Sequence, residues 1–220
     1  MKLYLSSYRL GNGIDTLLPL LGGGRRVEIV GNALDLIPTD QREHYRDKVY
    51  DPAAEFAGFG LEADELDLRD YFMHREGLAG TLANYDLVWV LGGNSFVLRR
   101  AMMLSGFDRA IRGALARGMV YGGFSAGAVV ATPTLHGIDL MDDPLPVPAR
   151  YSAEVIWGGL GLVDFSIVPH IQSAHPETEL AALALANMVR LNMPHRALRD
   201  GEVIVREGDA IRLVGSEFEQ

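Results

Sequence analysis

Short apolar runs alternate with helical patterns along most of the chain. Five runs, each bounded by Gly, Asp or Pro, have the composition of strands buried on both faces: 3–6, 27–30, 87–91, 119–123 and 165–169. Three further segments have apolar residues at helical spacing, the second with a break near Ser105-Gly106: 40–50, 95–117 and 176–191. This alternation predicts an α/β fold, a three-layer sandwich with a mostly parallel sheet covered by helices on both sides.

The last part of the chain follows a different pattern. Three segments that alternate apolar and polar side chains are separated by Gly-containing turns: 197–199, 202–206 and 210–214. They predict a C-terminal antiparallel meander at one edge of the sheet. Residues 137–161, rich in Asp, Pro and Gly, predict a long loop of the kind that is often functional. Because there is no internal repeat or low-complexity linker, residues 1–220 are expected to form a single domain.

The composition narrows the function. The 220 residues carry 20 Lys and Arg against 29 Asp and Glu, a net charge of −9, so most of the surface would repel a nucleic acid. The absence of cysteine excludes disulfides, thiolate metal sites and a Cys nucleophile. No apolar run reaches the roughly 18 residues of a membrane span, and the N-terminal apolar stretch is too short for a signal peptide. We therefore expect a cytoplasmic protein with neither a nucleic-acid nor a membrane partner.

The strongest chemical signal is Gly-Phe-Ser-Ala-Gly at residues 123–127. This G-x-S-x-G pattern lies between a predicted strand and a helix-compatible run, which is the setting of a nucleophile elbow. Small neighbours leave room for a serine in strained backbone, and the helix that follows favours developing negative charge. The pattern predicts Ser125 as a nucleophile, and the alternative is a glycine-rich turn in which Ser125 only caps a helix.

A second glycine pair follows the predicted strand 87–91. Gly92 and Gly93 allow backbone N–H groups to turn toward a neighbouring site, as in an oxyanion hole, and Asn94 offers an amide for substrate contact. The alternative is an ordinary strand-to-helix turn with Asn94 as the helix cap. Both glycine loops are expected at the carboxyl ends of strands, where open α/β sheets bind ligands.

A nucleophilic serine needs a base and a carboxylate that orients the base. Among the six histidines, His170 directly follows the predicted strand 165–169 and is the candidate base. The residues alone leave the choice of acid open among four aspartates: Asp139, Asp142, Asp143 and Asp200. His170 and His175 lack a third metal ligand at a recognisable spacing, so no metal is expected.

Together these motifs resemble peptidase E, the aspartyl dipeptidase family of serine peptidases. The resemblance rests on Gly-Gly-Asn-Ser-Phe at 92–96, Gly-Phe-Ser-Ala-Gly-Ala at 123–128 with Pro133-Thr134 after it, and Pro169-His170. It runs over most of the chain and is strongest at 86–133 and around His170. It implies the class I glutamine amidotransferase-like fold, which also includes cyanophycinases.

The resemblance also implies roles for the matching residues. Ser125 matches the nucleophile, His170 the base, and the backbone at Gly92 and Gly93 the oxyanion hole. The N–H of Ala126 is expected to join that oxyanion hole.

Three positions near the substrate and the base complete the match. Asn94 matches a residue near the amino end of the substrate. Asp139 and Asp200 each match a candidate for the acid, and Asp200 is favoured because a turn after the core strands is a firmer platform than a long loop.

The sequence departs from the resemblance at the residue that reads the substrate. Similar aspartyl dipeptidases carry an Arg after the catalytic His that suits an Asp side chain, but here no Arg lies between His170 and Arg190. A substrate carboxylate needs a cation or several donors, and His175 and Arg150 are the candidate replacements.

The expected function is hydrolysis of small peptides, in the manner of a dipeptidase and with N-terminal Asp-X as one substrate, through an acyl-enzyme and without a cofactor. An esterase-type acyl hydrolase and a non-catalytic amino-acid or peptide-binding protein remain alternatives. A glutamine amidotransferase is excluded because the chain has no cysteine. The edge of the meander and Trp157 in the long loop suggest either a homodimer interface or, for Trp157, a specificity residue.

Overall fold

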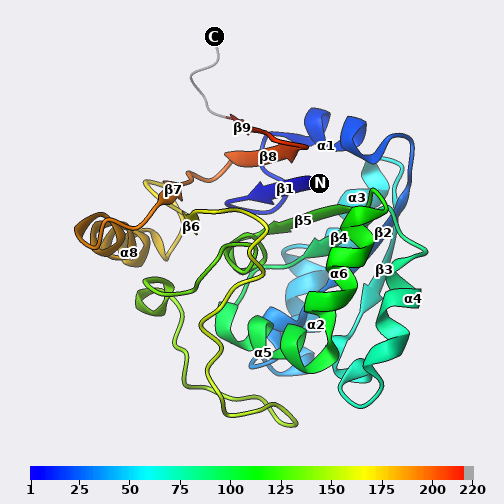
Figure 1. The fold of residues 1–220 in the computed structure, drawn as a ribbon, viewed down its shortest axis with the longest axis horizontal. Coiled ribbons are helices and arrows are strands. Elements are labelled where there is room, and N and C mark those ends of the chain that lie inside the picture. Colours follow the sequence, from blue (N-terminus) through cyan, green and yellow to red (C-terminus); the bar gives the residue numbers. More distant parts are fainter. Residues whose placement is uncertain (216–220) are drawn as a thin grey trace.

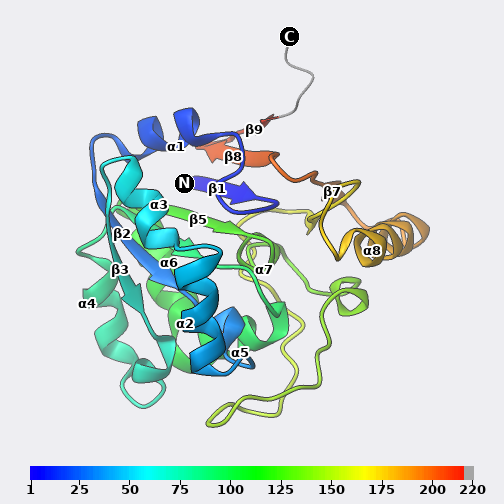
Figure 2. The ribbon, with the colours of Figure 1, turned by 180° about the vertical axis from the view of Figure 1, so that it is seen from behind.

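A seven-stranded sheet runs through the middle of the computed structural model, which describes residues 1–215 (Figures 1 and 2). Its strand order is β3-β2-β4-β5-β1-β8-β9, and the first five of these strands are parallel. The strands are β1 (Lys2–Ser6), β2 (Arg26–Val30), β3 (Glu62–Leu66), β4 (Leu87–Val90), β5 (Val120–Phe124), β8 (Val203–Glu207) and β9 (Ala210–Val214). The sheet is therefore mostly parallel, with an antiparallel C-terminal edge, as the sequence predicted.

Helices cover both faces of the sheet (Figures 1 and 2). One face carries α1 (Ile14–Leu21), α2 (Thr39–Lys48) and α3 (Pro52–Gly58), and the other carries α4 (Leu78–Leu82), α5 (Ser95–Ser105) and α6 (Phe107–Ala116). The predicted break at residues 105–106 separates α5 from α6, where Gly106 is left-handed with φ 76°. No helix among residues 1–215 is both long enough and apolar enough to cross a membrane.

Successive side chains of the central strands point to opposite faces of the sheet and so contribute to two hydrophobic cores. On β1, Leu3 and Leu5 pack into the core beneath α4, α5 and α6, whereas Tyr4 packs into the core beneath α1 and α3. All three side chains are fully buried. Central parallel strands covered on both faces therefore consist almost entirely of apolar residues, which is why the sequence revealed them.

A second, two-stranded sheet lies beyond the main one. It pairs β6 (Ser166–Val168) in parallel with β7 (His195–Ala197). Two expectations were therefore wrong: the strand predicted at 165–169 does not join the main sheet, and the segment predicted at 197–199 is not a strand of the antiparallel meander. Only β8 and β9 form the antiparallel hairpin, which pairs with β1. Alternation of side chains predicts a strand but does not specify its partner.

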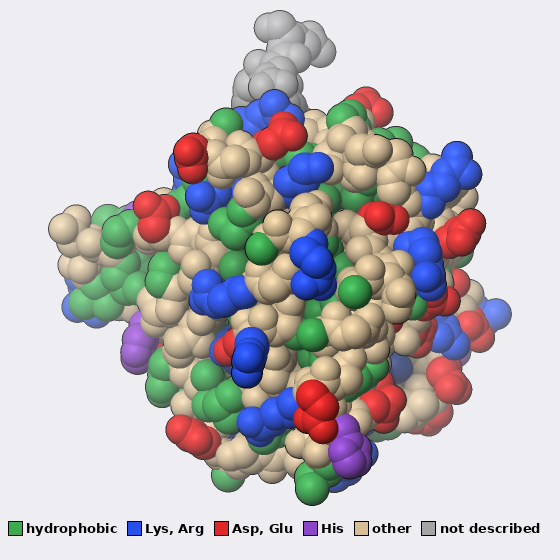
Figure 3. All heavy atoms as spheres, turned by 45° about the vertical axis from the view of Figure 1, so that its right-hand side comes forward, with side chains coloured by type: hydrophobic (Ala, Val, Ile, Leu, Met, Phe, Trp, Pro, Cys, Tyr) green, Lys and Arg blue, Asp and Glu red, His purple; other side chains and the backbone are tan. Residues whose placement is uncertain are grey.

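Helix α8 (Thr178–Arg190) follows the loop after β6 and projects from the body of the molecule (Figures 1 and 2). Its inner face packs through Ala181, Ala184 and Met188 in a third hydrophobic cluster. Its outer face exposes Leu180 and Leu183, and hydrophobic side chains gather on the protruding part at the left of Figure 3.

The sheet brings several loops to one edge. The parallel strands β1, β4 and β5 all end there, followed by Ser7, by Gly92-Gly93 and by Ser125. The register of β1 on β5 pairs Ser6 with Phe124, so Ser7 and Ser125 lie side by side.

Candidate active site

Ser125 lies in a sharp turn between β5 and α7 (Ala126–Val129). Its backbone has φ 47° and ψ −116°, a conformation that costs a non-glycine residue about 1–3 kcal/mol. The backbone N–H of Ser125 donates to the carbonyl of Ser7 at 3.1 Å, which helps to hold the turn. A Cβ at Gly127 would lie 2.2 Å from the carbonyl oxygen of Val90, so only glycine fits there. These are the strand, turn and helix of a nucleophile elbow.

The glycine loop after β4 runs beside Ser125. A Cβ on Gly92 would lie 3.2 Å from the Cβ of Ser125, and Gly93 has φ 133°, which a side chain would strain. The N–H groups of Gly92 and Gly93 donate no hydrogen bond to any described residue. The N–H of Ala126 is the first of α7 and has no partner within that helix. The turn thus presents unused backbone donors near Ser125.

His170 is 1% exposed and follows β6 in a left-handed conformation, with φ 64°. Its Nδ1 lies 2.8 Å from Oδ1 of Asp200, a residue of the loop between β7 and β8. Its Nε2 is buried and has no hydrogen-bond partner among residues 1–215. One ring nitrogen is therefore fixed by a carboxylate and the other is left for a proton transfer.

Asp200 is held from two sides. Its Oδ1 accepts a hydrogen bond from Oγ of Ser7 at 2.9 Å as well as the contact with His170. Partial burial acts to raise the pKa of Asp200, but the hydrogen bonds from His170 and Ser7 and the charge of the nearby His170 outweigh it and lower the pKa below its usual value. Asp200 is therefore ionised at neutral pH.

Ser125 and His170 line the same cavity, of about 740 Å³, together with Gly92 and Gly93. A cavity of this size accommodates a small ligand. A nucleophile elbow, a histidine–carboxylate pair and free backbone N–H groups therefore meet at one concave site.

Comparison with known proteins identifies the family. The model of Peptidase family S51 matches residues 26–214, which is most of the chain. The chain belongs to peptidase family S51. It is a serine peptidase of the peptidase E family, so its substrate is a peptide.

Curated relatives and solved structures agree with this family. The S51 peptidase is 31% identical over 211 residues to peptidase E of Streptomyces coelicolor, across 94% of this chain and 78% of that protein. It is 30% identical to an uncharacterized peptidase of Listeria innocua, across 69% of each chain. A crystal structure described as a peptidase E protein of Listeria monocytogenes superposes with a TM-score of 0.77 at 23% identity, covering 97% of this chain and 98% of that one. This likeness confirms the predicted fold.

The other aspartates considered from the sequence lie in different surroundings. Asp139 of the S51 peptidase is exposed and accepts a hydrogen bond from the backbone N–H of Gly137 at 2.8 Å. Asp142 accepts from the N–H of Ser95 at 2.9 Å, and burial, with a smaller contribution from the charge of Glu177, raises its pKa to about 6. Asp143 accepts from the N–H of Leu145 at 2.9 Å. Among residues 1–215, Asp200 is the one of the four aspartates that forms an ion pair with His170.

Asn94 has the role that the sequence gave as the alternative. Its Oδ1 accepts from the N–H groups of Phe96 and Val97 and so caps α5. Its Nδ2 donates to the carbonyl of Asp143 at 2.9 Å and ties the long loop to this cap. Both ends of the amide are therefore used within the protein, and the geometry does not favour the predicted contact with substrate. Trp157 likewise lies outside the cavity, stacked on His136 with ring centroids 4.4 Å apart.

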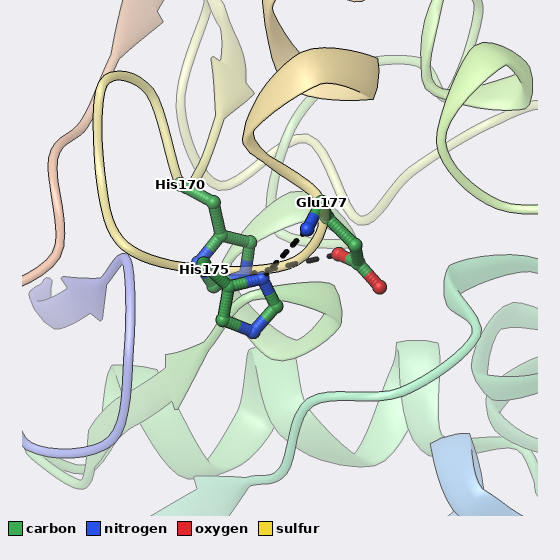
Figure 4. Close-up of side chains that lie close together, drawn as sticks. All are labelled: His170, His175 and Glu177. Atoms are coloured by element: carbon green, nitrogen blue, oxygen red, sulfur yellow. Dashed lines mark hydrogen bonds and ion pairs between the residues drawn. The ribbon is translucent and has the colours of Figure 1, made fainter.

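His175 and Glu177 adjoin the free side of His170 (Figure 4). The rings of His170 and His175 stack with centroids 3.7 Å apart and 9° between their planes, and Oε2 of Glu177 lies 4.0 Å from Nε2 of His170. Burial, followed by the charge of His170, lowers the pKa of His175 below its usual value. The three side chains could offer metal ligands within 4.8 Å of one another. However, imidazole lone pairs lie in the ring plane, and those of two parallel stacked rings do not converge on one ion, so the geometry does not suit a metal.

Sequence reasoning missed two residues of the S51 peptidase that the structure brings to the site. Ser7 contacts His170 and Asp200, and Arg9 lines the cavity beside them. Neither belongs to a local motif, and only the adjacency of β1 and β5 could have pointed to them. Arg150, a candidate from the sequence, is exposed, donates to the carbonyl of Arg69 and does not line the cavity.

Proposed function

We propose that this S51 peptidase hydrolyses dipeptides and other short peptides through Ser125, His170 and Asp200, by way of an acyl-enzyme. The observation that carries the proposal is the state of His170. Its Nδ1 is bonded to Asp200 at 2.8 Å, whereas its Nε2 is buried, unbonded among residues 1–215, and part of the same cavity wall as Ser125. This asymmetry is what a general base requires.

In the first half of the reaction, Oγ of Ser125 attacks the carbonyl carbon of the peptide bond, and Nε2 of His170 takes the hydroxyl proton. The tetrahedral intermediate collapses, its C–N bond breaks, and His170 returns the proton to the leaving amine. In the second half, His170 takes a proton from the water that attacks the acyl ester. The second tetrahedral intermediate collapses, its bond to Oγ of Ser125 breaks, and His170 returns the proton to Oγ as the acid product leaves.

The negative charge of the tetrahedral oxygen needs donors that are already in position. The N–H groups of Gly92, Gly93 and Ala126, which have no hydrogen-bond partner among residues 1–215, would supply these donors. Loss of one such donor in related chemistry costs about 10²–10³ in kcat, so these backbone groups supply a large part of the rate.

The role of Asp200 is to orient His170 and to stabilise the imidazolium that forms during the reaction. The lowered pKa of Asp200 keeps it ionised for this purpose at neutral pH. Asp139, the second candidate from the sequence, is less suited because its carboxylate is exposed and bonded to Gly137.

Peptides with an acidic first residue belong among the proposed substrates, and the reaction needs no cofactor. An esterase activity on activated esters is compatible with the same machinery, and a comparison of peptide and ester substrates would separate the two. The binding-protein alternative is not proposed, because the chain belongs to a peptidase family. The cytoplasmic location and the homodimer stay predictions, and sedimentation of the purified protein would test the latter.

A fluorophosphonate probe and a dipeptide panel test the proposal together. The wild-type protein should be labelled and should release free amino acids, whereas Ser125→Ala should do neither and His170→Ala should lose at least about 10³-fold in both rates. Ser152→Ala is the matched control, because within the described part of the chain the Ser152 hydroxyl bonds only the N–H of Glu154. Hydrolysis that persists in Ser125→Ala would contradict the proposal.

A further inference from the structure

The ring of His175 lies against one face of the candidate base. Figure 4 shows the imidazoles of His170 and His175 one over the other, and their centroids are 3.7 Å apart with 9° between the planes. Aromatic rings in proteins usually have centroids about 4.5–7 Å apart, so this contact is close. His170 is itself 1% exposed, so a ring that touches its face limits how far the imidazole can tilt.

The hydrogen bond to Asp200 does not fix the whole orientation of His170. It holds Nδ1 2.8 Å from Oδ1, but the ring can still swing about that contact and carry Nε2 with it. The stacked ring of His175 opposes motion out of the plane, and the ring of Tyr8, 6.1 Å away, meets the imidazole at 70°. Proton transfer depends on this orientation, because a displacement of about 1 Å in a reacting group can lower a rate by about 10²-fold.

His175 is held in turn by the residues at the start of α8. Its Nδ1 accepts the N–H of Glu177 at 3.3 Å, and its carbonyl accepts the N–H of Thr178, where α8 begins, at 3.1 Å. Its ring also meets that of Tyr8, with centroids 5.4 Å apart. The position of the His175 ring is therefore set by a helix terminus and by an aromatic residue just after β1.

The charge state of His175 suits a position beside the base. Burial, followed by the charge of His170, lowers the pKa of His175, although Glu177 and Asp200 act in the opposite direction. His175 is therefore neutral at neutral pH. A neutral ring tolerates the imidazolium that His170 becomes during the reaction, whereas a second imidazolium 3.7 Å away would repel it.

We infer that His175 is a positioning residue: by stacking on His170, it holds the plane in which Nε2 of the base receives and returns the proton of Ser125. The inference rests on the proposed function and adds to it a residue that acts through the base. What His175 contributes is a flat ring, so its own nitrogens take no part in the proton transfer.

Two substitutions separate the ring of His175 from its nitrogens. His175→Ala removes the ring, and kcat should fall by about 10–100-fold while KM stays within about threefold, because the base is misplaced and the substrate is not. His175→Phe restores a flat ring that cannot titrate, and kcat should return to within about fivefold of the wild type. The assay uses the dipeptide that the wild type hydrolyses fastest, and the rate of fluorophosphonate labelling should change by the same factors.

The dependence of kcat/KM on pH tests whether residue 175 faces the base. The acid limb of this profile reports the essential base of the free enzyme, and His175→Phe should keep its midpoint within about 0.5 pH unit of the wild type. His175→Arg places a planar, permanent cation at the same position. It should lower the midpoint by about 0.5–1 pH unit, because a nearby positive charge disfavours the imidazolium of His170.

His136 provides the matched control. It forms the same kind of stack, on Trp157 with centroids 4.4 Å apart and 8° between the planes, but it is exposed and does not line the cavity. His136→Ala and His136→Phe should leave kcat and KM within about twofold of the wild type. Thermal unfolding verifies that all variants fold, which is expected at position 175 because the His175 side chain is only partly buried.

Four results would overturn the inference: full activity in His175→Ala, a loss in His175→Phe as large as in His175→Ala, a fall in kcat/KM that comes from KM alone, or an unchanged midpoint in His175→Arg. Failure of the proposed function looks different. Hydrolysis that persists in Ser125→Ala would remove the proposed reaction. Normal dependence on Ser125 and His170, with full activity in His175→Ala, would remove only the role of His175.

Discussion

The substitution Asp200→Asn is the sharpest test of the candidate catalytic geometry. It keeps the size and shape of the side chain but removes the charge that Oδ1 places 2.8 Å from Nδ1 of His170. A charge-assisted hydrogen bond contributes about 1.5–3 kcal/mol, which corresponds to about 10–150-fold in rate. The amide can also donate to Nδ1 and hold His170 in the wrong tautomer, which in comparable triads raises the loss to about 10⁴.

We therefore expect kcat/KM of Asp200→Asn to fall by about 10²–10⁴, mostly through kcat, since Asp200 acts through His170 and not on the substrate. The assay is dipeptide hydrolysis followed by mass spectrometry, with the rate of fluorophosphonate labelling as an independent measure of the activated serine. Both rates should fall together. The same variant should unfold at a lower temperature than the wild type at neutral pH, because it loses the ionised partner of His170.

The dependence of that stability difference on pH has a definite sign. The pKa of Asp200 is lowered in the folded protein, so its contribution to stability is present above the ordinary aspartate pKa and is lost as the pH falls through the lowered value. The difference in melting temperature between wild type and Asp200→Asn should therefore shrink below about pH 4.

Asp139→Asn is the matched control. The carboxylate of Asp139 is exposed and, among residues 1–215, bonds only the N–H of Gly137, so the kcat/KM of this variant should stay within about twofold of the wild type. If Asp139→Asn loses as much activity as Asp200→Asn, or if Asp200→Asn retains nearly full activity, the assignment of the acid is refuted.

Three further substitutions test other parts of the structure. Gly92→Ala would place a Cβ 2.8 Å from the ring of Phe124 and 3.2 Å from the Cβ of Ser125, so kcat/KM should drop by at least about tenfold while the melting temperature changes by only a few degrees. Burial raises the pKa of Glu28 from 4.5 to about 7, so the folded protein loses stability as the pH rises from about 4.5 to about 7. Glu28→Gln should therefore be more stable than wild type at pH 8, by at most about 3 kcal/mol in urea unfolding, and the gap should close below about pH 4.5. Phe56→Ala empties a fully buried position and should lower the free energy of unfolding by about 3–5 kcal/mol, and a loss below about 1 kcal/mol would show that the core has collapsed around it.

The sequence predicted the strands that are surrounded by apolar side chains on both faces. The central strands β1, β2, β4 and β5 carry mostly apolar residues because both of their faces are covered, and Glu28 of β2 is a buried exception. The edge strand β3 reads Glu-Ala-Asp-Glu-Leu and was missed, since an edge strand with one neighbour tolerates charge on both faces. β7 was assigned to the wrong sheet because its parallel partner, β6, lies far away in the sequence.

In the candidate site, too, the residues of local motifs could be predicted, whereas the contacts between distant segments could not. Ser125 and the glycines around it form a local motif whose backbone geometry depends on residues adjacent in the sequence. The structure has that geometry. His170 and Asp200 were candidates among several, and their pairing depends on the positions of two loops that no local pattern specifies. Arg9, which lines the cavity, had no signal at all, because an arginine after a strand is typical of a solvated turn.

Ser7 explains how the three candidate catalytic residues are held together. Its carbonyl accepts the N–H of Ser125, its Oγ accepts the N–H of His170 at 2.8 Å, and the same hydroxyl donates to Asp200 at 2.9 Å. Ser7 is fully buried and directly follows β1, which is paired on both sides, so its own position is fixed by the sheet. Ser125 and His170 both adopt left-handed backbone, with φ 47° and 64°, and such strain persists only where surrounding contacts over-determine it. The hydrogen bonds of one small residue at the end of a central strand supply those contacts, so the precision of the candidate triad derives from the sheet and not from the loops that carry two of its members.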